Sequence, residues 1–126
     1  MKNKAFLNPL TPIQLSYLAG LIDGEGWVGV ARRKRAWKRR PERMYYIRPH
    51  IKIAMATEEP LKTVTGWLNG SVETITREND KYQLSFHAPS LRWLLPALIP
   101  FLVLKRAQAQ LVYEFVTRCR YQGKEL

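Results

Sequence analysis

Two acidic residues stand close together in a glycine-rich stretch of this chain. Residues 18–26 read LAGLIDGEG, with Asp23 and Glu25 separated by one glycine. A helix is predicted over residues 13–24, so both carboxylates fall at its C-terminal end. The helix dipole disfavours negative charge there by about 1 kcal/mol or less for each group. A bound cation would relieve that conflict. The alternative is that Asp23 caps a neighbouring helix and Glu25 begins a solvated strand.

Small residues form a stripe along the same predicted helix. Ser16, Gly20 and Gly24 recur at every fourth position, with Ala19 beside them. Glycine inside a helix costs about 1 kcal/mol relative to alanine, so Gly20 needs a packing reason. Small residues at this spacing allow another helix to approach closely. The stripe therefore predicts a helix–helix contact next to the acidic pair.

The whole stretch resembles the signature of the LAGLIDADG homing endonucleases. Residues 18–23 match six consecutive letters, and Glu25 and Gly26 match the second acid and the final glycine. The resemblance implies an α+β fold of order αββαββα, with an antiparallel saddle-like sheet and helices on one face. The match in element order extends over residues 13–120. We therefore interpret residues 1–126 as a single domain with one motif, at 18–26.

The resemblance also implies roles for individual residues. In the family the final motif acid binds the catalytic divalent metal, and that acid is Glu25 here. The backbone carbonyl of Gly24 is similar to a further metal contact of the family, and Asp23 corresponds to an acid that is structural at the helix interface. A basic residue before the last helix often assists cleavage, which makes Lys105 the candidate. The alternative for Lys105 is a surface lysine at a helix start.

One departure from the family pattern concerns the water network of the active site. Some members carry a glutamine at the end of the second strand and a basic residue one turn later. This sequence has Thr57 and Leu61 at those places, with Lys62 adjacent. This departure favours the alternative in which cleavage is slow or lost while DNA binding remains.

One motif per chain predicts a homodimer. Mg²⁺ is usually held by one or two carboxylates together with waters and phosphate oxygens, and two copies of Glu25 from two chains would build such a site. Mg²⁺ is the expected cofactor, with Mn²⁺ or Ca²⁺ as substitutes in binding. The expected reaction is metal-dependent hydrolysis of both strands at a long pseudo-palindromic DNA site. The predicted dimer interface consists of Ser16, Ala19, Gly20, Asp23 and Gly24.

The charge of the chain favours a polyanionic partner. The sequence contains 21 Lys and Arg against 10 Asp and Glu, a net charge of +11. Eight of the twelve residues from 32 to 43 are basic, and this run supplies +7 of the total. A membrane-surface helix would need apolar residues at helical spacing, which the run lacks, so double-stranded DNA is the expected partner and a membrane is not. A solvated loop or a localisation signal is the plainer alternative for the run.

The remaining elements form a sheet that presents this charge. Strands are predicted over residues 27–33, 44–56, 72–77 and 81–87, and helices over 57–68, 91–98 and 105–121. Alternation within 44–56 places isoleucines on one face and polar residues on the other, while Pro49 indicates an edge or a bulge. The polar face would lie in the DNA major groove. The predicted DNA-binding residues are Arg33, Lys34, Arg35, Lys38, Arg39, Arg48, His50, Lys52, Arg77, Lys81, Gln83 and Ser85. Trp27 is expected to contact either the core or DNA.

Other classes of protein are disfavoured. The single cysteine, Cys119, cannot form an intrachain disulfide, and no apolar run reaches the length of a membrane span. No secretory signal is visible, so we expect an intracellular protein, in an organelle or in the cytoplasm of a bacterium or phage host. Two alternatives to an endonuclease remain. One is an RNA maturase or a non-cleaving DNA-binding protein on the same fold, and RNA is a partner only in the maturase case. The other is a basic RNA-associated structural protein.

Overall fold

The structure of the chain, a computed structural model, describes residues 10–34, 45–68 and 75–118. In chain order its elements are α1 (Pro12–Glu25), β1 (Gly26–Lys34), β2 (Tyr45–Met55), α2 (Glu59–Leu68), β3 (Ile75–Glu78), β4 (Lys81–His87), α3 (Ala88–Leu98), the 3₁₀ turn η3 (Ile99–Phe101) and α4 (Arg106–Arg118). The predicted order, αββαββα followed by one more helix, is confirmed, and so is the α+β class. Most of the basic run and Cys119 lie outside the described residues.

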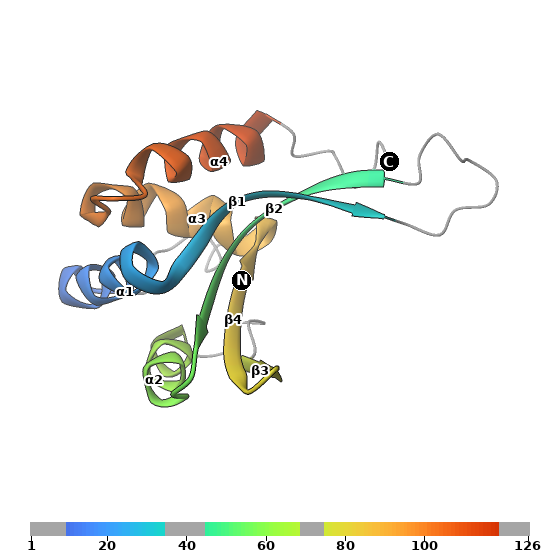
Figure 1. The fold of residues 1–126 in the computed structure, drawn as a ribbon. Helices are drawn as coiled ribbons and strands as arrows, with labels where there is room; N and C mark the ends of the chain where they lie inside the picture. The colour runs from blue at the N-terminus through green and yellow to red at the C-terminus, as the bar shows by residue number, and fades with distance from the viewer. Residues whose placement is uncertain (1–9, 35–44, 69–74, 119–126) are drawn as a thin grey trace, which may run out of the picture.

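The four strands form one antiparallel sheet in the order β1-β2-β4-β3. Helices α1, α3 and α4 lie on one side of this sheet, as predicted (Figure 1). Strand β2 is central, yet its pairing with β4 begins only at His50. At Pro49 it therefore runs beside β1 alone, where the missing backbone N–H of proline costs no ladder hydrogen bond. The predicted local edge at Pro49 is confirmed.

Helix α1 begins and ends as its sequence dictates. The Thr11 hydroxyl accepts from the Gln14 N–H at 3.1 Å, and the Gln14 side chain accepts from the Thr11 N–H at 2.9 Å, with Pro12 in the first turn. At the other end the Gly26 N–H donates to the Ile22 carbonyl. A Cβ on Gly26 would lie 2.8 Å from both the Cα and the carbonyl oxygen of Ile22. The passage from α1 into β1 therefore requires glycine at this position.

Two other helices begin at positions that differ from the prediction. Helix α2 starts at Glu59 rather than at residue 57, and α3 starts at Ala88 rather than at residue 91. In both helices a proline, Pro60 or Pro89, occupies the first turn, where its fixed φ fits and its missing N–H is not needed. The position of the proline therefore marks these two starts.

The β3–β4 hairpin closes through a two-residue turn. Asn79 and Asp80 have φ values of 52° and 64°, the left-handed pair that a type I′ turn needs. The register then places Leu84 and Phe86 in the core, where both are fully buried. Gln83 and Ser85 alternate with them and face the other side of the sheet. The predicted facing of β4 is confirmed.

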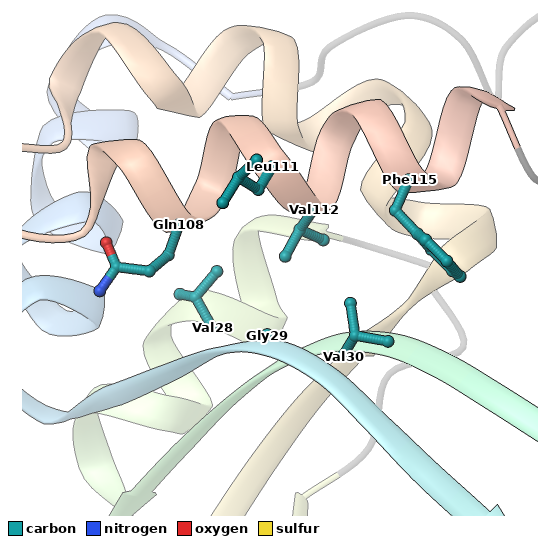
Figure 2. Close-up of a pocket in the computed structure, with 7 residues that line it drawn as sticks. All are labelled: Val28, Gly29, Val30, Gln108, Leu111, Val112 and Phe115. Atoms are coloured by element: carbon teal, nitrogen blue, oxygen red, sulfur yellow. The ribbon is translucent and has the colours of Figure 1, made fainter.

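Strand β1 shows the same division between its two faces. Val28 and Val30 point toward α4, and they line a groove of about 360 Å³ together with Gln108, Leu111, Val112 and Phe115 (Figure 2). The groove is apolar and has no titratable side chain in its lining. Trp27 and Ala31 therefore face the opposite, polar side of the sheet. Among the described residues no helix is both long and apolar enough to cross a membrane.

Candidate functional site

The Asp23 carboxylate caps the last helix of its own chain. Its Oδ2 accepts from the Val103 N–H at 2.8 Å, and its Oδ1 accepts from the Lys105 N–H at 2.9 Å. Helix α4 starts at this point, because the Lys105 carbonyl accepts from the Ala109 N–H. Lys105 is the residue just before α4, so Asp23 satisfies one of the N–H groups that the helix leaves unpaired at its start. The capping alternative for Asp23 is confirmed.

The Lys105 ammonium makes the reciprocal contact. Its Nζ donates to the carbonyls of Ile22 and Asp23, at 3.1 Å and 2.8 Å, at the C-terminal end of α1. A cation at this end of a helix satisfies unpaired carbonyls and offsets the negative end of the dipole. Lys105 is half-buried and fixed by these bonds, so it is not the freely solvated surface lysine of the plainer interpretation.

These contacts set the protonation of Asp23. Partial burial of the carboxylate acts to raise its pKa. The backbone N–H groups of Val103, Lys105 and Leu104, together with the charge of Lys105, outweigh that effect. The pKa of Asp23 is therefore lowered below its ordinary value of 3.8. Asp23 links the end of α1 to the start of α4, and its carboxylate is ionised at neutral pH.

Glu25 differs from Asp23 in every respect that matters for binding. It is the last residue of α1 and is exposed, and among the described residues no group pairs with its carboxylate. Gly24 is exposed as well, and no atom lies within 4 Å of the place where its Cβ would be. An exposed carboxylate and an accessible backbone carbonyl are oxygen donors of the kind that Mg²⁺ prefers. The residues present therefore fit a hard divalent cation.

One chain offers only part of such a site. Within the described ranges, no three His, Cys, Asp or Glu side chains are grouped so that they could hold a metal. Glu25 and the carbonyl of Gly24 leave most of an octahedral shell to other donors. Further ligands must come from solvent, from a bound phosphate or from a second chain.

The predicted dimer stripe is confirmed in part as an exposed surface. Ser16, Gly20 and Gly24 are exposed along one side of α1, and a Cβ on Gly20 would also meet no atom within 4 Å. Ala19 was wrongly included, since it is 1% exposed and packs in the core beside Leu18 and Ile22. The helical step of 100° per residue places it on that face. Asp23 also leaves the stripe, because its carboxylate turns to α4.

The polar face of the sheet carries most of the predicted DNA-binding side chains that the structure describes. Arg48 and Lys52 lie on β2, and the register places Ser85 and Gln83 beside Lys52 and Ala54. Lys81 follows on the same face of β4 and is exposed. The Gln83 amide donates to the Glu78 carboxylate at 3.0 Å, so one of its polar groups is already engaged.

Two of the predicted DNA-binding residues are corrected by the structure. His50 lies on the polar face but is only 4% exposed, because the Trp27 ring lies over it with centroids 4.9 Å apart. Arg77 pairs with Tyr82 in the register and so points to the helix side of the sheet. Its guanidinium lies 5.2 Å from the Tyr82 ring and 3.8 Å from the Asp80 carboxylate.

The remaining DNA-binding predictions fall at or beyond the limit of the described chain. Arg33 and Lys34 lie in β1, but for these two residues only the backbone is described. Arg35, Lys38 and Arg39 lie outside the described residues. The family's water-organising positions are described: Thr57 is exposed after β2, whereas Leu61 is fully buried in the core. Leu61 therefore cannot serve an active site.

The sequence did not reveal the mutual capping of Asp23 and Lys105. The two residues are 82 positions apart, and half of the contact is made by backbone groups that carry no sequence signal. The Trp27–Gly29 contact on the polar face was missed as well. A glycine two residues after an exposed tryptophan, on the same face of a strand, is the signal that would have indicated it.

Comparison with solved structures identifies this architecture. The chain superposes on the homing endonuclease I-CvuI, crystallised with a DNA target in the presence of Mg, with a TM-score of 0.73, 24% identity and coverage of 86% of this chain and 68% of that chain. A second structure of I-CvuI with its target, in the presence of Ca, gives a TM-score of 0.70 at 26% identity over 84% of this chain and 67% of that chain. The LAGLIDADG meganuclease I-CpaMI, bound to uncleaved DNA, gives a TM-score of 0.68 at 19% identity. The match covers 94% of this chain but 39% of I-CpaMI.

The sequence matches no family model, and a search of curated proteins finds no significant relative. Fold and motif nevertheless agree: the sheet, its helix layer and residues 18–26 correspond to one class of protein. The chain therefore has the fold of the LAGLIDADG homing endonucleases and carries a close match to their motif at residues 18–26.

Proposed function

We propose that the chain is a site-specific DNA endonuclease that acts as a homodimer and needs a divalent metal ion. One observation carries the proposal: at the end of α1, Asp23 is fixed to the fold whereas Glu25 is exposed and has no partner among the described residues. A carboxylate held at the unfavourable end of a helix, with nothing to neutralise it, is a ligand for a cation. Its neighbours in the fold, I-CvuI and I-Vdi141I, were crystallised with DNA.

The dimer follows from the same helix. Exposed Ser16, Gly20 and Gly24 leave room for a second helix, and no contact among the described residues explains the two glycines. Val103 and Leu104, next to the end of α1, are 80% and 69% exposed. A second copy would cover these apolar side chains and bring two Glu25 carboxylates together around one twofold axis. The coverage of less than half of I-CpaMI supports a working unit of two such domains.

Each side chain then has a role in hydrolysis. Glu25 and the carbonyl of Gly24 would hold the metal, which would supply the positive charge that activates water and stabilises the leaving oxygen. Lys105 holds a fixed positive charge on the carbonyl of Asp23, one residue before Gly24. There it offsets the negative charge of the phosphate. Arg48 and Lys52, on the polar face, position the DNA backbone.

The experiment uses the chain's own coding locus, joined across any intron, as substrate. Plasmid carrying that sequence should be linearised in Mg²⁺ or Mn²⁺ and left intact when EDTA replaces the metal. Tight binding without a cut in either metal would overturn the enzyme and leave a non-cleaving DNA-binding protein. The buried Leu61, at a position that is basic in some relatives, favours that second candidate.

Sedimentation tests the dimer independently. The wild-type chain should sediment as a dimer at micromolar concentration, and Gly20→Leu should sediment as a folded monomer. A Cβ there meets no described atom of its own chain within 4 Å, and the larger leucine side chain would occupy the space of the partner helix. A wild-type monomer both free and on DNA, or a Gly20→Leu dimer of unchanged stability, would contradict the shared site.

A further inference from the structure

We propose that Trp27 is a specificity-determining residue that contacts thymine methyl groups near the cleavage site. The inference rests on the proposed function and assigns a role to a residue outside the predicted set. Trp27 is 44% exposed and lies on the polar face of the sheet, opposite to Val28 and Val30, which point toward α4 (Figure 2). Tryptophan is enriched at interaction surfaces, because it combines a large apolar area with a polar N–H.

Gly29 fixes the position of this ring. A Cβ on Gly29 would lie 2.8 Å and 2.9 Å from Cη2 and Cζ2 of Trp27. The benzene ring of the indole therefore occupies the space that any other side chain at position 29 would take. Because Gly29 has no side chain, the indole lies against the strand instead of projecting freely into solvent.

His50 supports the ring from the next strand. It is the register partner of Gly29, and its ring centroid lies 4.9 Å from that of Trp27 with an interplanar angle of 39°. His87 continues the row on β4, with a centroid 5.9 Å from that of His50. An indole held from two sides loses little conformational freedom when it binds, so its contacts contribute nearly their full free energy.

The position of Trp27 in the chain defines what it can reach. It follows Glu25 by two residues along the start of β1, which corresponds to about 7 Å at the rise of an extended strand. A DNA duplex whose scissile phosphates lie at Glu25 therefore places its neighbouring base pairs at Trp27. The apolar group that a base pair presents in the major groove is the C5-methyl of thymine, and an aromatic side chain is suited to contact it.

The chemistry of the surrounding face supports this choice of ligand. Arg48 and Lys52 flank His50 on β2 and are suited to phosphates and to guanine. Ala31 and Ala54 add only single methyl groups to this face, so Trp27 supplies its largest described apolar surface. The indole is therefore the described side chain best suited to contact the methyl group that distinguishes thymine from cytosine.

The test selects binding sites from a library of randomised DNA duplexes, using the full chain with Ca²⁺ in place of Mg²⁺. The wild-type chain should recover a site with thymine at one or two positions next to its centre. Replacing that thymine by deoxyuridine, which lacks the methyl, should weaken wild-type binding roughly fourfold, the value of one buried carbon. Trp27→Ala should bind both duplexes equally, and Trp27→Phe should recover part of the discrimination.

Two further variants distinguish an effect on the position of the indole from a general effect on folding. Gly29→Ala keeps the indole but displaces it, so it should lose the same discrimination while its thermal unfolding stays cooperative. Trp93→Phe, in α3 on the helix side, is the matched control and should discriminate like the wild type. An unchanged preference for thymine in Trp27→Ala would overturn the role of Trp27 but leave the proposed DNA recognition standing. If the wild-type chain recovers no site from the library, the proposed DNA recognition fails and this inference fails with it.

Discussion

Asp23 and Lys105 cap each other's helices. The carboxylate of Asp23, near the end of α1, accepts the N–H groups of Val103 and Lys105 at the start of α4, at 2.8 Å and 2.9 Å. The ammonium of Lys105 donates to the carbonyls of Ile22 and Asp23 at the end of α1. The contact joins the negative end of one helix to the positive end of another. It fixes the backbone from which Gly24 and Glu25 extend.

The Asp23→Asn variant should lower the free energy of unfolding by roughly 1–2 kcal/mol, the usual value of a lost helix cap. An amide has one acceptor oxygen where the carboxylate has two, so either the Val103 or the Lys105 N–H loses its partner. Thermal or urea unfolding measures the change. Glu114→Gln, an exposed change on α4, is the control and should be neutral. Equal stability of the two variants would contradict the capping role.

The same carboxylate predicts a dependence of stability on pH. The pKa of Asp23 is lowered in the folded chain, so its ionised form stabilises the fold at every pH above the ordinary value of 3.8. That contribution is lost as the pH falls below this value and through the lowered pKa. The stability difference between wild type and Asp23→Asn should therefore be constant from neutral pH down to about pH 5 and then shrink. A difference that grows with acid would show that the pKa is raised instead.

The Lys105→Met variant should lose both stability and activity. Removing the ammonium takes a fixed donor from the Asp23 carbonyl and one of two donors from the Ile22 carbonyl, which also accepts from the Gly26 N–H, and this should cost about 1–3 kcal/mol. Cleavage should fall further than the loss of folded protein explains, because the fixed charge beside Gly24 is gone. The comparison is made at a temperature where circular dichroism shows both proteins folded. If cleavage then matches the wild type, Lys105 acts only as a helix cap.

Gly26 and Gly20 should respond in opposite directions to alanine. In Gly26→Ala the new Cβ would lie 2.8 Å from backbone atoms of Ile22, which cannot move aside, so the free energy of unfolding should fall by roughly 1–3 kcal/mol. In Gly20→Ala the Cβ meets no atom within 4 Å, and the gain in helix propensity is up to about 1 kcal/mol. Unfolding of both variants under conditions where the chain is monomeric tests the contrast. A stable Gly26→Ala would show that the α1–β1 junction tolerates a side chain.

Much of the fold was predictable because its signals are local. The alternation of β2 and β4, the Asn79–Asp80 turn and the capping of α1 at Thr11 each depend on neighbouring residues. The errors arose where burial of a side chain depends on how the elements pack in three dimensions. Ala19 was assigned to the stripe because it is small, yet the pitch of α1 turns it into the core. His50 has the correct parity for the polar face, but a tryptophan from another strand covers it.

The site shows the same limit. Residue type and place at a helix end indicated both Asp23 and Glu25, and the family resemblance implied that Glu25 is the metal ligand. The structure leaves Glu25 exposed. The function of Asp23 and Lys105 as a pair depends on backbone donors and acceptors that no side-chain pattern records. Sequence reasoning therefore pointed to the end of α1 as the candidate site and missed the contact that holds it in place.

The most direct test of the account is the cleavage of a selected DNA site by Glu25→Gln. The account predicts that this variant binds the site in Ca²⁺ as tightly as the wild type or slightly better, because a negative charge near phosphate is removed. In Mg²⁺ it should produce no double-strand cut, while Glu114→Gln cuts at the wild-type rate. Cleavage by Glu25→Gln at the wild-type rate would contradict the account, because the end of α1 would then not be the metal site.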